Sequence, residues 1–177
     1  MAFPATAKSA LERLKQGPVA VVFDPAVAGE VEVFVKGGVS VSVERNLAAA
    51  ETDLLGVYDL FSQGETATFE LTLDETSHNV AKIVFMDQVQ AASYVGIGQA
   101  AGISSRGIAK PVRIRPWQTR TVATLQLEFW LAVPDGNATK NMTASEPWSF
   151  AQGFKCLPDL SRANGELIGK LTFPVRA

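Results

Sequence analysis

The sequence predicts a mainly β protein: a β-sandwich or barrel with one flanking α-helix. Three observations lead to this fold class. Apolar and polar residues alternate in short segments, as expected for half-buried strands. Glycine, proline and asparagine or aspartate separate these segments, as at turns. In the interior of the chain, apolar residues recur at clear helical spacing near residue 80. About seven or eight strands with one main helix are typical of a sandwich or barrel.

The first seventeen residues are expected to form an N-terminal arm or a short helix, followed by a single domain over residues 18–177. Ser9-Ala-Leu-Glu12 is a capping-box sequence, and Gly17-Pro18 would end a helix that began there. The remaining length suits one domain of roughly 100–200 residues, and no internal repeat or linker divides it.

The strands of the N-terminal half are predicted from alternation and turn residues. Val19–Phe23 reads as a buried strand, and residues 30–36 as an alternating one. Gly37-Gly38 permits a tight reversal into a strand over residues 39–44. Residues 66–73 alternate in the same way, and residues 51–65 are expected to form an acidic loop that carries unusually many apolar residues.

The second half continues with a helix, a loop and further strands. Asp74 and Thr76 are expected to cap a helix whose apolar face carries Val80, Ile83 and Val84. Residues 96–109 are rich in glycine and serine and predict a mobile loop. Four more strands are predicted over residues 112–115, 123–131, 148–156 and 167–173.

Composition gives little support to catalysis or metal binding. The chain has one cysteine, Cys156, and one histidine, His78, too few for a disulfide framework or the usual zinc ligand sets. We predict a buried Cys156, a His78 at the start of the helix, and no catalytic, cofactor-binding or metal-binding residue. Net charge of −2 gives no overall basic field for nucleic acid, and no apolar run is long enough to span a membrane.

The order of these patterns resembles the major tail tube proteins of long-tailed (siphovirus-like) bacteriophages. No single stretch carries the resemblance, which covers roughly residues 18 to 173. The matching segments are Gly38-Val-Ser-Val-Ser-Val-Glu44, Glu51-Thr-Asp53, Gly56-Val-Tyr-Asp-Leu-Phe61, Gly64-Glu-Thr-Ala67, Leu71-Thr-Leu-Asp-Glu-Thr76, Pro111-Val-Arg-Ile-Arg-Pro116, Phe154-Lys-Cys-Leu-Pro-Asp159 and Gly165-Glu-Leu-Ile168.

The resemblance implies a structural virion protein, not an enzyme, made in the host cytoplasm and located in the phage tail. Its subunits would form hexameric rings whose inner strands join into a continuous barrel, and the rings would stack into a tube. The implied partners are further copies of the chain, a tape-measure protein, a tail terminator, and baseplate or tail-tip proteins. DNA would pass through an acidic lumen without specific binding, and no cofactor or membrane insertion is implied.

Charge is distributed unevenly along the chain. Residues 44–75 carry eight acidic residues and one basic residue, whereas residues 106–120 carry five basic and no acidic residues. Either both segments are solvated faces, or they meet on neighbouring subunits in a head-to-tail assembly. The apolar residues of the acidic loop either pack in the subunit's own core or become ordered against a neighbour. The candidate subunit-interface residues are Leu47, Glu51, Asp53, Leu54, Leu55, Tyr58, Phe61, Arg113 and Arg115.

Two other functions fit the same sequence. A ring-forming tube protein of a bacterial secretion or contractile system would share the architecture and differ in its partners. A small soluble β-sandwich that binds a ligand or acts as an enzyme would instead be a discrete monomer with a polar-lined pocket.

Overall fold

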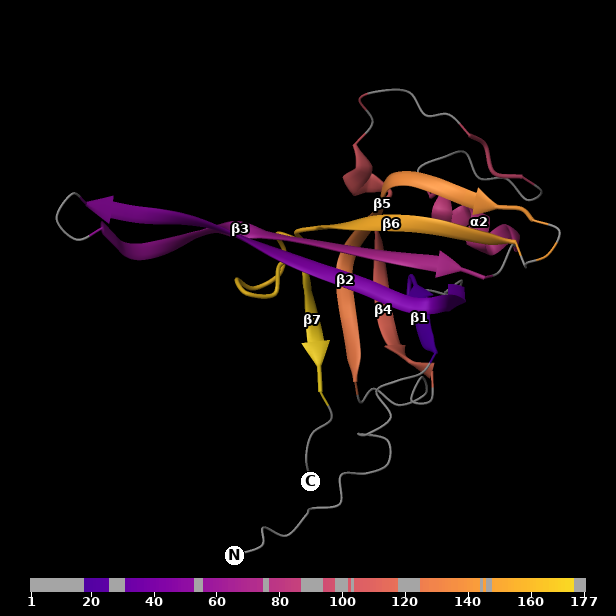
Figure 1. The fold of residues 1–177 in the computed structure, drawn as a ribbon, viewed down its shortest axis with the longest axis horizontal. Helices are drawn as coiled ribbons and strands as arrows, with labels where there is room; N and C mark the ends of the chain where they lie inside the picture. The colour runs from indigo at the N-terminus through magenta and orange to yellow at the C-terminus, as the bar shows by residue number, and fades with distance from the viewer. Residues whose placement is uncertain are drawn as a thin grey trace, which may run out of the picture.

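Antiparallel β-structure dominates the protein, which confirms the predicted fold class (Figure 1). The structure is a computed structural model. It describes residues 18–25, 31–52, 56–74, 77–86, 94–97, 102, 104–117, 125–143, 145 and 148–173. The expected N-terminal arm or helix over residues 1–17 lies outside these described residues.

Six strands close into a barrel through antiparallel pairing, and a seventh strand lies beside them. The ladder runs β4-β1-β2-β3-β6-β5, and β5 pairs back with β4, which closes the circuit. The short β7 pairs with β5 alone. The strands are β1 (Val19–Phe23), β2 (Val31–Thr52), β3 (Gly56–Leu73), β4 (Lys110–Pro116), β5 (Gln126–Asn141), β6 (Ser149–Leu157) and β7 (Gly169–Thr172).

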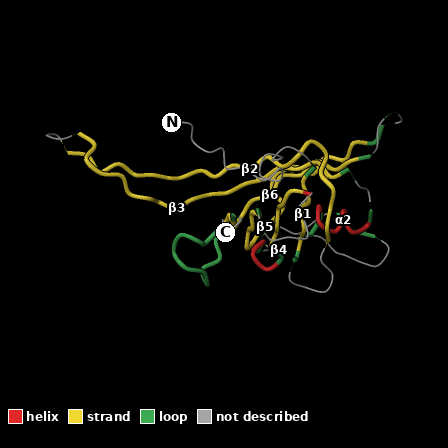
Figure 2. Tube along the Cα trace, turned by 90° about the horizontal axis from the view of Figure 1, so that it is seen from below, coloured by secondary structure: helices red, strands yellow, loops and turns green. Residues whose placement is uncertain are grey.

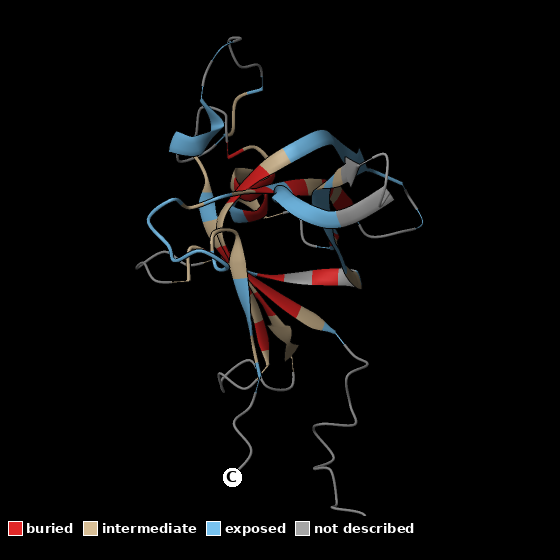
Figure 3. Ribbon diagram, turned by 90° about the vertical axis from the view of Figure 1, so that its left-hand side faces the viewer, coloured by how far each residue is buried: buried red, intermediate tan, exposed pale blue. Residues whose placement is uncertain are grey.

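Aromatic rings fill the centre of the barrel. The ring of Phe69 stacks on that of Phe154 at 4.9 Å and on that of Phe129 at 5.4 Å between centroids, and Phe23 lies 5.4 Å from Phe154. These four residues come from β1, β3, β5 and β6, so one cluster joins both halves of the barrel. Such ring pairs contribute about 0.5–1.5 kcal/mol each beyond the burial of their surface. Figure 3 shows the buried residues gathered in this region.

The predicted helix is confirmed, but its cap is not the expected one. Helix α2 (His78–Val84) buries Val80, Ile83 and Val84 against the barrel core, and His78 is its first residue. The N-cap is Ser77, whose hydroxyl oxygen accepts a hydrogen bond from the Val80 amide at 3.3 Å. The helix therefore begins after the predicted caps Asp74 and Thr76, because a serine nearer the apolar run meets its free amides.

Two sites predicted as turns are bulges inside long strands. Gly37 and Gly38 both have positive φ and shift the register of β2 against β3, but β2 continues straight through them. The expected turn at Pro134-Asp-Gly136 is likewise an irregularity within β5, which runs on to Asn141. A bulge uses the same glycines as a tight turn, so the residues alone did not distinguish the two.

The glycine- and serine-rich stretch is only partly described. Ser105–Gly107 form a short 3-10 helix, in place of the loop expected over residues 96–109. The Arg106 guanidinium donates a hydrogen bond to the Pro158 carbonyl at 2.7 Å, which joins this helix to the segment after β6.

Candidate functional site

The most conspicuous surface feature is a two-stranded extension of β2 and β3, here called the hairpin arm and defined as residues 44–65. Its strands pair from Glu44 opposite Thr66 to Thr52 opposite Gly56. Figures 1 and 2 show it projecting far from the barrel. The acidic loop predicted over residues 51–65 is thus largely a strand, because its alternating residues continue the pairing begun in the barrel.

The hairpin arm has no neighbouring strand on either side within the described structure. β1 pairs with β2 only as far as Phe34, and β6 pairs with β3 only as far as Ala67. Both outer edges of the arm therefore present backbone groups without a ladder partner. Unpaired strand edges are available for pairing with another chain.

Large apolar side chains lie exposed on both faces of the hairpin arm. Leu60 and Phe61 are consecutive and so project to opposite faces; they are 55% and 57% exposed. Leu47, on the facing strand, is 52% exposed. At the base of the arm, Val41 and Val43 continue the barrel's inner face into solvent. Several large apolar side chains exposed on one element favour an interaction site there.

A bulge and an ion pair shape the middle of the hairpin arm. Gly64 has φ of +110° beside the register shift between Asn46 and Leu47. Next to it, the Arg45 guanidinium donates to the Glu65 carboxylate at 2.9 Å across the two strands. This pair uses the one basic residue of the arm, and leaves Glu44, Glu51, Asp53 and Asp59 in excess.

The structure places four of the nine predicted interface residues on this one element. Leu47 and Phe61 are exposed on the hairpin arm, and Glu51 and Tyr58 lie in its strands. Asp53, Leu54 and Leu55 fall outside the described residues. The alternative that Leu47 and Phe61 belong to the subunit's own core is wrong, since neither is buried.

Arg113 and Arg115, by contrast, are engaged within the subunit. The Arg113 guanidinium donates to the Glu128 carboxylate at 2.8 Å, and Arg115 lies 3.7 Å from the Glu32 carboxylate. Lys110 pairs in the same way with Asp24 at 2.7 Å. Lys110, Arg113 and Arg115 thus each meet an acidic neighbour within the subunit, which does not favour their use as charges for a neighbouring subunit.

Glu128 is the centre of a cross-strand charge row. Arg113 and Lys170 lie directly opposite it on β4 and β7, and its carboxylate contacts both. Burial acts to raise the pKa of Glu128, but hydrogen bonds and charge from Arg113 and Lys170 outweigh it and hold the pKa below its usual value. The row fixes β7 to the barrel.

The surroundings of Cys156 do not favour a reactive thiolate. Cys156 is buried as predicted, and burial raises the pKa of its thiol to about 12, far from the range of a reactive thiolate. Within the described residues no three histidine, cysteine, aspartate or glutamate side chains gather in a way that could hold a metal. Across the same residues, no helix combines the length and the apolar character needed to cross a membrane.

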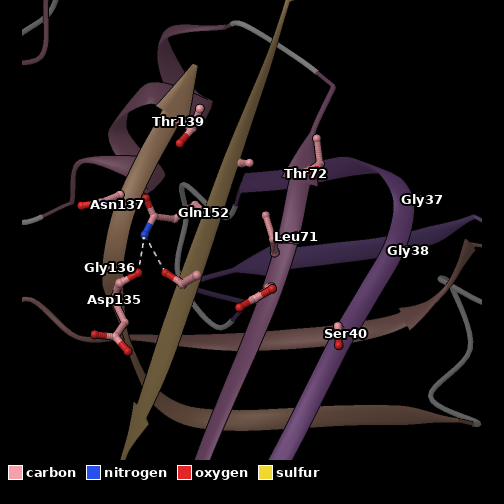
Figure 4. Close-up of a pocket in the computed structure, with 13 residues that line it drawn as sticks. Gly37, Gly38, Ser40, Leu71, Thr72, Asp135, Gly136, Asn137, Thr139 and Gln152 are labelled. Atoms are coloured by element: carbon pink, nitrogen blue, oxygen red, sulfur yellow. Dashed lines mark hydrogen bonds between the residues drawn. The ribbon is translucent and has the colours of Figure 1, made fainter. Parts of the chain in front are cut away.

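A polar hollow of about 500 Å³ lies over the irregularity in β5 (Figure 4). The Gln152 side-chain amide donates to the carbonyls of Asp135 and Gly153 at 3.1 and 2.6 Å. Its oxygen is buried without a hydrogen-bond partner in the described structure. Glu70 and Asp135 flank Gly153 at the rim. The hollow is open, and its described lining includes no histidine or cysteine.

Sequence reasoning missed two further exposed apolar patches. One lies where β5 ends and β6 begins, with Met142, Trp148 and the Lys140 ammonium 5.1 Å from the Trp148 ring. The other lies near β7 and comprises Leu160, Leu171 and Phe173. Trp130 on β5 donates a hydrogen bond to the Glu166 carbonyl and stacks under Arg162. Alternation did not reveal the two patches, because the predicted strands 148–156 and 167–173 do not show which of their residues the fold leaves uncovered.

Comparison with known proteins places no name on these features. No protein-family model matches the chain, and no curated protein matches it. The proposed function therefore rests on the hairpin arm and the barrel themselves.

Proposed function

We propose that the protein is a structural subunit that assembles head to tail into stacked rings, and that these rings form the tail tube of a long-tailed phage. The observation that carries the proposal is the hairpin arm, with exposed apolar residues on both faces and two free strand edges. An isolated two-stranded ribbon is marginally stable in water. A partner that covered the arm would remove this exposure and pair its edges.

The closed barrel limits the strand edges through which two copies can join. The resemblance led us to expect inner strands shared between subunits, and in the structure six strands close within one chain. Among the described strands, free edges remain on the hairpin arm, on β7, and on β5 beyond Ala132, where β4 no longer pairs with it. The proposal gives the arm the main role in joining copies, because it combines free edges on both sides with exposed apolar residues. In that assembly DNA would travel through the lumen towards the host.

A tube protein of a secretion or contractile system would use the same arm, and its partners would distinguish it. A monomeric ligand-binding module is favoured less, because it leaves the hairpin arm without a role. The polar hollow of Figure 4 is the feature that such a module would use.

The first test compares the native protein with Phe61→Ser by sedimentation velocity and negative-stain electron microscopy over a range of concentration. We expect rings or hollow tubes from the native chain. Burial of a phenylalanine stabilises by about 1.5–3 kcal/mol, so the variant should need roughly 10- to 100-fold more protein to assemble. Ile97→Ser removes a large apolar residue outside the arm that is even more exposed than Phe61, 85% against 57%, and serves as the control.

Both proteins should melt at closely similar temperatures, because Phe61 makes no core contact. A native protein that stays monomeric at every concentration, with or without pre-formed seeds, contradicts the proposed function. If Phe61→Ser assembles as readily as the native chain, the hairpin arm has no role in the proposed assembly.

A further inference from the structure

A surface that receives the hairpin arm of another copy should have a suitable position, exposed apolar residues and a charge opposite to that of the arm. The inference rests on the proposed function and names the partner surface of the same site. Two exposed apolar patches lie outside the arm, near β7 and at the end of β5, and only one of them fits all three features.

Charge separates the hairpin arm from the rest of the chain. The arm, residues 44–65, holds five acidic residues and one basic residue, a net charge of −4. Residues 18–43 and 66–177, the body, hold twelve basic and twelve acidic residues and have no net charge. Arms of two copies would repel one another, whereas the body of a second copy offers an arm no net repulsion and can attract it wherever a cation is unpaired. This complementarity favours a contact between unlike surfaces.

The patch near β7 has its cations already paired. Arg162 lies 3.3 Å from the Asp159 carboxylate, and Lys170 lies 3.1 Å from that of Glu128. Arg106 donates to the Pro158 carbonyl. Leu160 and Phe173 supply apolar surface there, but no cation in the described patch is left to meet an acidic partner.

The patch at the end of β5 differs in this respect. Met142 and Trp148 are 61% and 50% exposed. The Lys140 ammonium lies 5.1 Å from the centroids of the Trp148 and Phe150 rings, and it contacts no carboxylate among the described residues. A cation held over an exposed tryptophan ring suits an incoming strand that carries both apolar and acidic side chains.

The positions of the hairpin arm and of the patch at the end of β5 also favour a contact between them. In Figure 1 the hairpin arm extends to one end of the long axis, and the junction of β5 and β6 lies at the other end. Contact between opposite ends of identical molecules joins two different patches and leaves a free arm and a free receptor after each addition. Such a contact propagates, as a growing tube requires.

We propose that the patch formed by Lys140, Met142 and Trp148 receives the hairpin arm of a second copy of this chain. The apolar residues of the arm pack on Met142 and Trp148, and its acidic residues lie within reach of Lys140. The partner is a second copy, because the arm supplies apolar side chains to cover Met142 and Trp148 and negative charge to complement Lys140.

Mixing two single-cysteine variants tests the assignment directly. One protein carries Ser62→Cys on the hairpin arm, and the other carries Thr143→Cys beside the receptor patch; both positions are exposed. A short bis-maleimide is added under assembling conditions, and Cys156 stays unlabelled because it is buried. We expect a cross-linked dimer only from the mixture. Asn164→Cys, exposed near the β7 patch, replaces Thr143→Cys in the matched control.

The outcomes separate this inference from the proposed function. Cross-linking to Asn164→Cys, cross-linking of Ser62→Cys with itself, or rings and tubes without any cross-link would overturn the receptor and leave the tube proposal standing. Absence of any assembly by sedimentation contradicts the tube proposal, and the receptor with it.

Charge reversal supplies an independent readout. Lys140→Glu should raise the protein concentration needed for assembly at least tenfold, while Lys155→Glu, an exposed lysine on β6 away from the patch, should leave it within twofold. Melting temperatures identify any variant that fails to fold. Equal assembly by both variants in the folded state would overturn the role of Lys140.

Discussion

At the scale of single residues, the charge row Arg113, Glu128 and Lys170 shows why a local pattern of charges is a poor guide to an interface. The sequence presents a basic run, but each arginine of β4 alternates with apolar residues and meets a carboxylate on a neighbouring strand. Strand register, which the sequence does not reveal locally, converts an apparent binding surface into internal pairing.

Glu128 gives a prediction about pH. Its pKa in the folded protein lies below the ordinary value of 4.5, so the row stabilises the fold fully above that pH. The stabilisation is lost as pH falls from about 4.5 through the folded-state pKa. Glu128→Gln should cost roughly 1–3 kcal/mol at neutral pH and flatten the loss of stability on acidification. Urea unfolding between pH 7 and pH 3 measures both effects.

Asp135→Asn, an exposed carboxylate at the rim of the polar hollow, is the control for that experiment. It should unfold like the native protein across the same range. A native-like pH profile for Glu128→Gln would mean that the row contributes nothing to the stability of the barrel.

At the scale of elements, alternation in the sequence predicted most strands, the helix α2 and the buried face of residues 67 to 73. It failed at the glycines. Gly37 and Gly38 have positive φ as a turn would require, but they form a bulge within β2. Pairing partners beyond the turn decide between the two outcomes, and these partners are distant in sequence.

The candidate site was predicted in part for the same reason. The apolar residues of the hairpin arm were recognised as too many for an ordinary loop, and Leu47 and Phe61 are exposed. That they lie on a paired ribbon was not foreseen, since the acidic residues around them are uncommon in strands. The receptor patch was missed because Lys140, Met142 and Trp148 acquire a common surface only when β5 and β6 pair.

The two faces of the hairpin arm lead to a second prediction. Leu60 lies opposite Ala49 on one face, and Phe61 lies opposite Ala48 on the other. If neighbouring copies cover both faces, Leu60→Ser should impair assembly about as strongly as Phe61→Ser. Sedimentation equilibrium of the two variants compares them. Normal assembly by one of them would show that a single face of the arm is covered.

At the scale of the whole molecule, the net negative charge of the arm and the cation Lys140 of the receptor patch predict how assembly responds to salt. Attraction between exposed charges is screened beyond about 8 Å at physiological ionic strength and about 3 Å at 1 M. Raising sodium chloride from 0.05 to 1 M should therefore increase the concentration needed for tube growth. Light scattering across the series measures it, and Lys140→Gln should show a weaker dependence. An identical response from both proteins would contradict the electrostatic part of the contact.

The closed barrel also has a consequence for the order in which the molecule is built. Closure requires β1 to pair with β4, as Val21 does with Ile114, whereas the hairpin arm needs only neighbours such as Asn46 and Gly64. Pairings between residues close in sequence form sooner than distant ones. During synthesis the arm is therefore complete while β4, β5 and β6 are still to be made. In the proposed assembly, its excess of acidic residues would keep the arms of nascent chains apart until a finished barrel can receive them.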